Sequence, residues 1–234
     1  MSKKTSKKTN PSSERDMSNV GEILSKSEQF IDKYQKQIIS GISAIVFIVV
    51  VVLGVKHLYL APKEKEAEAA IYKGEQYLAN SQWDLALNGD SVEYEGFEAI
   101  ISDYTFTKTA NLANAYAGIC YYHKGEFESA INRLKKFSAN DKMVSPVITG
   151  LVGDCYVDMD KVKEGIDYFL KAASKANDNM ISPVFLKKAG VAYESLGEYK
   201  KAIEAYTSIK DKYPASQEAS DIQKYIDRAE ILSK

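Results

Sequence analysis

The residue types that most often do chemistry are scarce in this chain, and they do not gather. Its 234 residues include two histidines, His57 and His123, and two cysteines, Cys120 and Cys155. These four residues lack the spacing of a metal site, and no serine, cysteine or carboxylate pair stands out as a nucleophile with its base. A glycine-rich phosphate loop is also missing from the sequence. We therefore expect no enzyme, no cofactor, no metal and no small-molecule substrate.

The two cysteines occupy equivalent positions, each two residues after a glycine, Gly118 or Gly153. If these positions lie on neighbouring helices they could face each other, and a disulfide could then form in an oxidising compartment. Packed helix axes lie about 8–10 Å apart, whereas a disulfide needs Cα atoms within about 7 Å. The pattern favours two small buried thiols and leaves their pairing open.

A repeated pattern accounts for most of the glycine and aromatic residues. It begins with a small residue and continues with an aromatic residue, a turn, a large residue, a second small residue and a large apolar one. The residues are Gly118, Tyr121, Gly125, Phe127, Ala130 and Leu134, then Gly153, Tyr156, Asp160, Val162, Gly165 and Phe169, then Gly190, Tyr193, Gly197, Tyr199, Ala202 and Tyr206. Their period of 35 to 37 residues resembles the tetratricopeptide repeat (TPR), a helical hairpin. The small residues let two helices approach closely, and glycine suits the turn.

Residues 38–61 form an apolar segment in front of these repeats. The stretch from Ile38 to Val55 contains no charged side chain, and about 20 apolar residues cross a bilayer as a helix. The alternatives are a buried core helix and a cleaved signal peptide. The rest of the chain offers too little to bury such a helix, and the preceding 37 residues are long for a signal peptide. We interpret the segment as a retained transmembrane signal anchor.

Charge on the two sides of this segment predicts its orientation. Cations exceed acids by three before Ile38, whereas acids exceed cations by five after Pro62. The positive-inside rule places the N-terminus in the cytoplasm and the rest of the chain across the inner membrane, which is the periplasm of a bacterium with two membranes. The formal net charge of −1 argues against nucleic-acid binding, which favours a basic surface.

Two different segments precede the anchor. Residues 1–17 are rich in Lys, Ser and Thr and should form a disordered basic tail. In residues 18–37 apolar side chains recur on one helical face, and Asn19 with Glu22 can form a capping box. This helix is either an amphipathic juxtamembrane helix on the cytoplasmic leaflet or a simple extension of the membrane helix.

Residues 62–234 should form a TPR domain of about four hairpins, closed by a capping helix from Glu218 to Leu232. The first hairpin breaks the period, because residues 80–94 are longer than a repeat turn. We expect an insertion there. It carries the only tryptophan, Trp83, which either packs in the core or serves function. The predicted fold class is all-α: a single N-terminal transmembrane helix followed by a TPR α–α solenoid with a C-terminal capping helix.

The concave surface of such a solenoid, lined by the first helix of each hairpin, is the candidate partner-binding groove. The side chains expected there mix apolar and acidic groups, which suits an apolar or basic segment of a protein partner. Only Lys187 fits the Lys and Asn pattern of TPR domains that clamp a C-terminal carboxylate, so that clamp is not supported. The candidate groove residues are Ile119, Tyr122, His123, Val147, Asp154, Asp158, Lys187, Val191 and Glu194.

A short tail, one anchor and a TPR domain together resemble the ancillary SecYEG translocon subunit family (YfgM-like). The resemblance is to its Bacteroidetes version through the phrases Leu87-Asn88-Gly89-Asp90, Gly96-Phe97-Glu98, Ala113-Asn114-Ala115-Tyr116-Ala117-Gly118 and Lys224-Tyr225-Ile226. It implies a membrane-anchored scaffold beside SecYEG and a PpiD-like membrane chaperone that assists the handling of translocated proteins. The alternative is a structural coordinator of outer-membrane or cell-wall assembly, which would use its repeats for protein contacts in the envelope.

Overall fold

The computed structural model describes residues 11–234, with side chains from residue 33 onward. The chain divides into two compact units, one up to Tyr59 and the other from Leu60 onward. The first unit contains α1 (Pro11–Gly54), followed by a π-helical turn, η1 (Val55–Leu60). The first ten residues of the tail expected over 1–17 lie outside the described residues. The rest of that stretch is helical, because α1 begins at Pro11, a residue that suits a first helical turn.

The apolar segment lies within one long helical stretch. The helix over residues 33–79 contains an 18-residue window with a mean hydropathy of 3.0, none of which is buried. Large apolar side chains are exposed along it, with Phe47 69% exposed. The helix is long and apolar enough to span a membrane. Residues 18–37 belong to α1 as well, so they and the apolar residues up to Gly54 form one helix, and the last apolar residues lie in η1 and at the start of α2.

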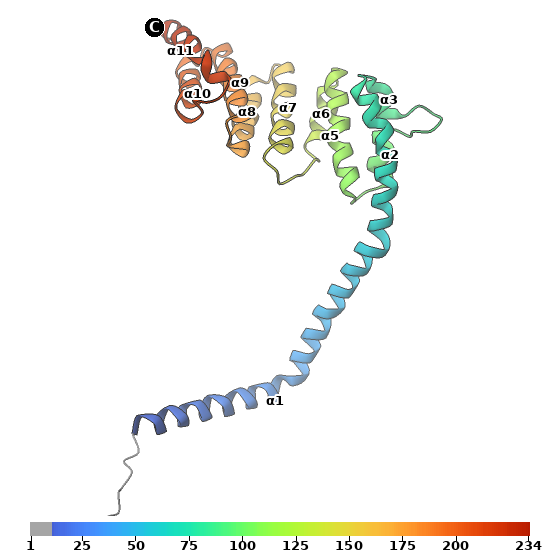
Figure 1. The fold of residues 1–234 in the computed structure, drawn as a ribbon, viewed down its shortest axis with the longest axis vertical. Coiled ribbons are helices and arrows are strands. Elements are labelled where there is room, and N and C mark those ends of the chain that lie inside the picture. Colours follow the sequence, from blue (N-terminus) through green and yellow to red (C-terminus); the bar gives the residue numbers. More distant parts are fainter. Residues whose placement is uncertain (1–10) are drawn as a thin grey trace, which may run out of the picture. The chain divides into compact units, whose positions relative to one another are not determined.

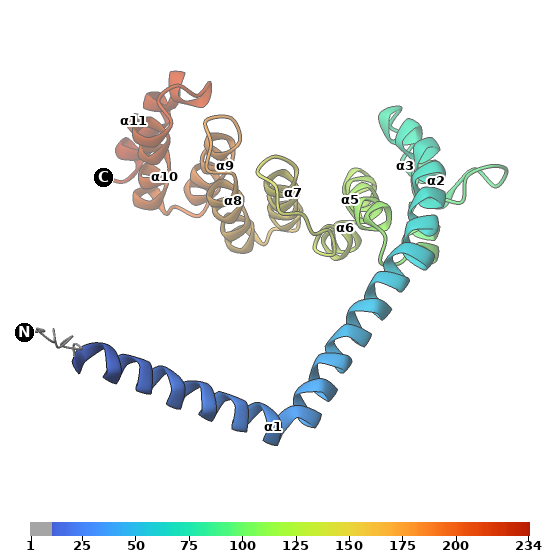
Figure 2. The same ribbon diagram turned by 60° about the horizontal axis from the view of Figure 1, so that its bottom comes forward.

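The second unit is a row of helical hairpins that lie side by side from α2 to α11 (Figure 1), as the turned view in Figure 2 also shows. Its helices are α2 (Ala61–Ala79), α3 (Trp83–Asn88), α4 (Phe97–Asp103), α5 (Lys108–His123), α6 (Phe127–Leu134), α7 (Val144–Asp158), α8 (Val162–Ala176), α9 (Ser182–Ser195), α10 (Tyr199–Lys212), η2 (Glu218–Ser220) and α11 (Ile222–Leu232). No strand occurs among residues 11–234, so the all-α prediction is confirmed for them.

Four turns with the same hydrogen-bond pattern join the helices of the hairpins. In each turn a backbone N–H donates to the carbonyl of the tyrosine five residues earlier, at 2.8–2.9 Å. The pairs are Gln82 to Tyr77, Glu126 to Tyr121, Lys161 to Tyr156 and Glu198 to Tyr193. The preceding residue has a positive φ in all four, 58° at Ser81, 77° at Gly125, 60° at Asp160 and 70° at Gly197. Glycine adopts this conformation at little cost, whereas serine and aspartate adopt it with some strain.

Close helix crossings confirm the role expected for the small residues. A Cβ placed on Gly118 would lie 2.5 Å from the Leu134 side chain. The same atom on Gly190 would lie 2.2 Å from the Tyr206 ring. Real carbon atoms do not approach this closely, so only glycine permits the observed distance between these helices.

The structure places the insertion of the first hairpin differently from the prediction over residues 80–94. The turn at Ser81 is a regular repeat turn, and Trp83 begins the second helix at the position that Phe127 holds in the next hairpin. The extra residues come later, between Asn88 and Phe97, and they divide the second helix into α3 and α4. Sequence analysis did not identify this turn because serine stands where glycine marks the turns at Gly125 and Gly197. Trp83 packs against the first buried cluster.

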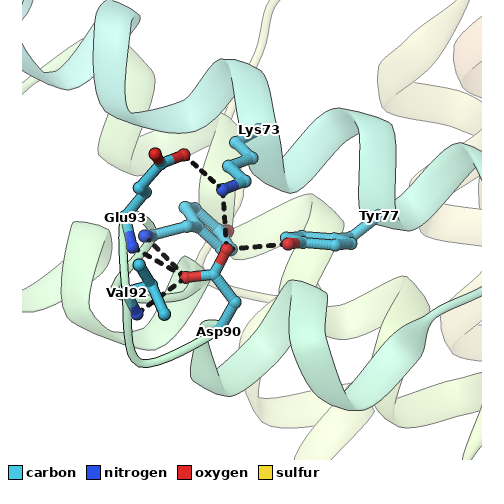
Figure 3. Close-up of polar contacts among 6 residues, drawn as sticks. Lys73, Tyr77, Asp90, Val92 and Glu93 are labelled. Carbon is cyan, nitrogen blue, oxygen red and sulfur yellow. Dashed lines mark hydrogen bonds and ion pairs between the residues drawn. The ribbon is translucent and has the colours of Figure 1, made fainter.

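Asp90 ties this extra segment to α2 (Figure 3). Its Oδ2 atom accepts a hydrogen bond from the Tyr77 hydroxyl and faces the Lys73 amino group, each at 2.7 Å. Its Oδ1 atom accepts the backbone N–H groups of residues 92–94 at 2.9–3.1 Å. The ion pair with Lys73, and then these backbone bonds, hold the pKa of Asp90 far below its ordinary value. One carboxylate therefore fixes both the base and the turn of the loop.

The core runs through the array as four successive buried clusters. Cys120 lies in the first cluster and Cys155 in the second, each fully buried and free. Burial raises the pKa of both thiols to about 12. Deeply buried neutral thiols pack as small apolar groups. At the end of the array, α11 buries Ile222 and Ile226 in the last cluster and so caps α10.

Candidate partner-binding groove

An apolar groove runs between the last two regular hairpins, and we call it the α7/α9 groove. Its volume is about 460 Å³. One helical face of α9 supplies most of its wall, because residues three and four apart point the same way. The lining residues are Asp154, Val157, Phe169, Val184, Lys187, Lys188, Val191, Ala192, Ser195 and Glu218.

Two lysines in the wall are already paired within the array. Lys188 donates to both carboxylate oxygens of Asp154, at 2.7 and 2.8 Å. Lys187 pairs with Asp221 at 2.9 Å and lies 4.5 Å from the centre of the Tyr225 ring. The groove therefore presents apolar side chains together with two lysines whose charges are neutralised in place, while Glu218 forms no ion pair among the described side chains.

Asp154 is the most perturbed acid of the groove. Burial raises its pKa above the ordinary value, although the pairing with Lys188 acts in the opposite direction. Two further carboxylates, Asp158 on α7 and Glu218 on η2, form no ion pair among the side chains that the structure describes. Of the two, Glu218 lines the groove, so a partner that brings a cation there would meet it.

A second hollow of about 590 Å³ adjoins the groove and shares Val184 and Glu218 with it. Its rim carries Met143 and Met180, which are 63% and 71% exposed. Methionine is flexible and polarizable and adapts to different apolar surfaces. Exposed methionines beside an apolar groove are typical of a surface that other chains contact.

The structure gathers some of the predicted groove residues and separates others. Asp154, Lys187 and Val191 line the α7/α9 groove. Val147 lies on α7 and is 47% exposed, but it does not line the groove. Glu194 accepts the Tyr206 hydroxyl at 2.9 Å and pairs with an arginine of α11, so it holds the capping helix.

The remaining predicted residues lie at the α5 end of the array. Ile119 and Tyr122 pack against the second buried cluster, and burial is the main cause that raises the pKa of Tyr122 to about 12. The charge of Asp158 adds to that shift. The His123 ring stacks on the Trp83 ring, with centroids 4.3 Å apart and planes 8° apart. These side chains fill space between neighbouring hairpins.

Sequence analysis missed several groove residues. Lys188 could have been found, since it lies four residues after Val184 on the face that also carries Val191. Phe169 and Glu218 could not, because they come from a second helix and from the segment after α10. Among the described side chains, no group of three or more potential metal ligands occurs. The arrangement is suited to binding a chain segment by apolar contact.

Comparisons with known proteins agree with this fold. Residues 186–216 match the family model for the tetratricopeptide repeat, and residues 98–172 match that for subunit 3 of the anaphase-promoting complex, or cyclosome. Nearly identical TPR-like repeats of a Podosopora anserina protein named as a kinesin light chain align at 12% identity and a TM-score of 0.53. That alignment covers 72% of this chain and 87% of the other.

Two crystal structures of MamA also align. They show 22% and 20% identity with TM-scores of 0.48 and 0.49, cover 68% and 74% of this chain, and cover 93% and 89% of their own chains. At these TM-scores they add nothing to the assignment of the fold. Among curated proteins, no sequence matches this chain.

The repeats, their shared turns and the glycine crossings define a helical solenoid of the tetratricopeptide-repeat type. Proteins of this class are scaffolds for protein–protein interaction, and stacked repeats supply the extended surface that such binding uses.

Proposed function

We propose that this chain is a TPR scaffold anchored by one transmembrane helix, with its array on the periplasmic side of the inner membrane. It binds protein partners at or near the Sec translocon and assists the handling of translocated proteins. The apolar helix ahead of the array supports the anchor. The excess of cations before that helix and of acids after it supports the orientation.

The observation that carries the binding role is the α7/α9 groove. Val184 and Val191 present apolar surface there, and Asp154 and Lys188, which are both partly exposed, neutralise each other in the same wall. A partner segment with apolar side chains fits this surface, and a basic residue at its end would meet Glu218. An emerging polypeptide or a loop of a membrane chaperone has such segments.

Recovery of partners from detergent-solubilised membranes tests the proposal. The tagged full chain is compared with Val184→Asp and Val191→Asp, which place a charge in the groove. Val92→Asp is the matched control, because Val92 is 85% exposed on the extra loop of the first hairpin. We expect SecYEG and a PpiD-like chaperone with the wild type and the control, and their loss with both groove variants.

If neither Sec components nor a membrane chaperone is enriched, the translocon assignment is wrong. Enrichment of outer-membrane or cell-wall machinery instead would support the envelope-assembly alternative. Orientation is tested separately with a reporter that is active only in the periplasm, fused after Lys234. An inactive reporter on a stably expressed fusion would reverse the orientation.

A further inference from the structure

A further cavity, distinct from the two hollows described above, lies on the side of α7 opposite to the α7/α9 groove. It has a volume of about 170 Å³ and lies between the end of α6, α7 and α8. Three exposed lysines line it, Lys135, Lys171 and Lys175, together with the hydroxyl groups of Ser145 and Thr149. No carboxylate is part of the lining. We call it the lysine cavity.

The length of α6 explains why a cavity exists there. Leu134 and Phe169 fill the same helix crossing in successive hairpins, against Gly118 and Gly153. Beyond Phe169, α8 continues to Ala176, whereas α6 ends at Leu134. The two missing helical turns leave space beside α7, and the chain that follows Leu134 brings Lys135 to its edge.

The lysines of this cavity lack the partners that other cations of the array have. Lys187 and Lys188 each pair with an aspartate, but no ion pair of Lys135, Lys171 or Lys175 occurs among the described side chains. Like charges that gather without a counter-charge repel each other and destabilise a fold. A cluster of this kind is therefore a candidate for an external anion.

Tyrosine rings hold two of the lysines in place. The Lys135 amino group donates to the Tyr156 hydroxyl at 2.9 Å and lies 5.2 Å from the ring centres of Tyr156 and Tyr168. The hydrogen bond with Tyr156 is the main cause that raises the pKa of Lys135 and keeps it cationic. Lys171 lies 5.8 Å from the Tyr168 ring centre. The two rings stack with centroids 5.3 Å apart.

The third lysine meets a buried hydroxyl group. Lys175 donates to the Ser145 hydroxyl, whose residue is only 4% exposed. No hydrogen bond among the described residues uses the proton of this hydroxyl. The contrast with the next hairpin is direct, because the equivalent Ser182 donates its proton to the Ala173 carbonyl at 2.8 Å. Ser145 is thus left with a donor in the wall of the cavity.

A carboxylate close to Lys175 is already committed. Asp141 accepts the backbone N–H groups of residues 143–145, at 2.6–3.3 Å, and caps the start of α7. Burial acts to raise the pKa of Asp141, but the backbone bonds, with a further contribution from the charge of Lys175, outweigh it and lower the pKa. Asp141 therefore serves the helix end and leaves the lysines without a full counter-charge.

We propose that the lysine cavity binds a phosphate group. Three cations and one free hydroxyl donor suit an anion with several oxygens and more than one negative charge, and lysine is a common phosphate ligand. A carboxylate has one charge and two oxygens, so it would leave donors unused. The volume of about 170 Å³ accommodates one such group. The group is either inorganic phosphate or the phosphate of a lipid headgroup.

The test measures inorganic phosphate binding to the full chain in detergent, by calorimetry and by thermal midpoint. We expect saturable binding and a raised midpoint with phosphate, and neither with acetate or chloride at equal ionic strength. The double variant Lys171→Gln/Lys175→Gln should bind at least ten-fold more weakly. Lys163→Gln is the matched control, because Lys163 is an exposed residue of the same helix outside the cavity.

Ser145→Ala provides a second variant that leaves the Asp141 cap in place, and it should weaken phosphate binding about three-fold. Equal effects of phosphate and acetate would refute the preference for phosphate. Unchanged binding by the double variant, with helix content preserved, would overturn the site.

The source of the phosphate is decided in nanodiscs with and without phosphatidic acid. If the headgroup occupies the lysine cavity, free phosphate binds more weakly to the wild type when phosphatidic acid is present, and this difference disappears in the double variant. If the affinity is the same in both nanodiscs, the ligand is a soluble phosphate.

Discussion

The first and last hairpins solve the same packing problem with different chain lengths. In the last hairpin, a Cβ on Gly190 of α9 would lie 2.2 Å from the ring of Tyr206. Tyr206 stands 16 residues later in α10, which is a single unbroken helix. In the first, a Cβ on Gly74 would meet Tyr94 and Phe97 at 2.1 and 2.6 Å, and Phe97 stands 23 residues later. The contact between the glycine of the first helix and a large side chain of the second helix defines the repeat. The number of residues between these two positions can change.

The largest expected effect tests whether Phe97 and Tyr206 are equivalent. Both side chains are fully buried, so Tyr206→Ala and Phe97→Ala should each destabilise the array by roughly 3–5 kcal/mol. Tyr206→Ala also removes the hydrogen bond to Glu194. Urea unfolding of the full chain in detergent measures both. A cost below about 1 kcal/mol for Phe97→Ala would show that the first hairpin does not use the repeat crossing.

A smaller effect is expected at the glycines themselves. In Gly190→Ala the new methyl group meets the fixed ring of Tyr206, and overpacking typically costs about 1–3 kcal/mol. In Gly74→Ala the new methyl group meets Tyr94 and Phe97, which are both buried, and the Tyr94 hydroxyl is held by its hydrogen bond to the Ala86 carbonyl at 2.8 Å. We therefore expect Gly74→Ala to cost about as much as Gly190→Ala, measured as the loss of urea stability. A cost below half that of Gly190→Ala would show that the extra loop moves away from the new methyl group.

The Asp90 contacts give the loop a pH dependence of its own. Because Lys73 and the backbone donors lower the pKa of Asp90 in the folded state, their stabilisation is complete above its ordinary value of 3.8 and is lost as the pH falls below it. Asp90→Asn should lower the thermal midpoint near neutral pH, and the gap from wild type should narrow between about pH 4 and pH 2. A constant gap would contradict the lowered pKa. Asp103→Asn, on an acid of α4, is the control.

The smallest effect concerns the turns. Ser81 and Gly197 hold the same turn position with φ of 58° and 70°. Ser81→Gly should stabilise the first hairpin by up to about 1 kcal/mol, since serine is strained at positive φ. Gly197→Ala should destabilise the last hairpin by about 1 kcal/mol. The added Cβ would meet no atom within 4 Å, so this cost comes from the positive φ alone. Hydrogen exchange of the two hairpins measures both. Effects of the opposite sign would show that the turns are not equivalent.

Sequence alone predicted the parts of the fold that depend on local chemistry. Glycine at Gly125 and Gly197 marks turns because few other residues accept positive φ, and the glycine at each crossing marks close helix packing. This reasoning did not predict the turn of the first hairpin or the place of its extra residues. Its turn uses Ser81, which carries no such mark, and its extra residues end at a phenylalanine whose contact with Gly74 only the folded chain reveals.

The candidate groove was harder to predict than the fold. A helical face on α9 can be read from spacing, which is why Lys187 and Val191 were found. The ion pair between Lys188 and Asp154 joins two hairpins 34 residues apart, and no periodicity indicates which lysine reaches the acid. The lysine cavity depends on the early end of α6 at Leu134, whereas the equivalent helix α8 continues beyond Phe169 to Ala176, and the repeat pattern does not indicate this difference.

The stacked rings of Trp83 and His123 allow the joint between the first two hairpins to be followed by tryptophan fluorescence. Trp83 is the only tryptophan, so all indole emission of the protein comes from that joint. Solvent shifts the emission of an indole to longer wavelength. Separation of α3 from α5 would therefore expose Trp83 further and red-shift the fluorescence, and the unlabelled protein can report its own opening in real time.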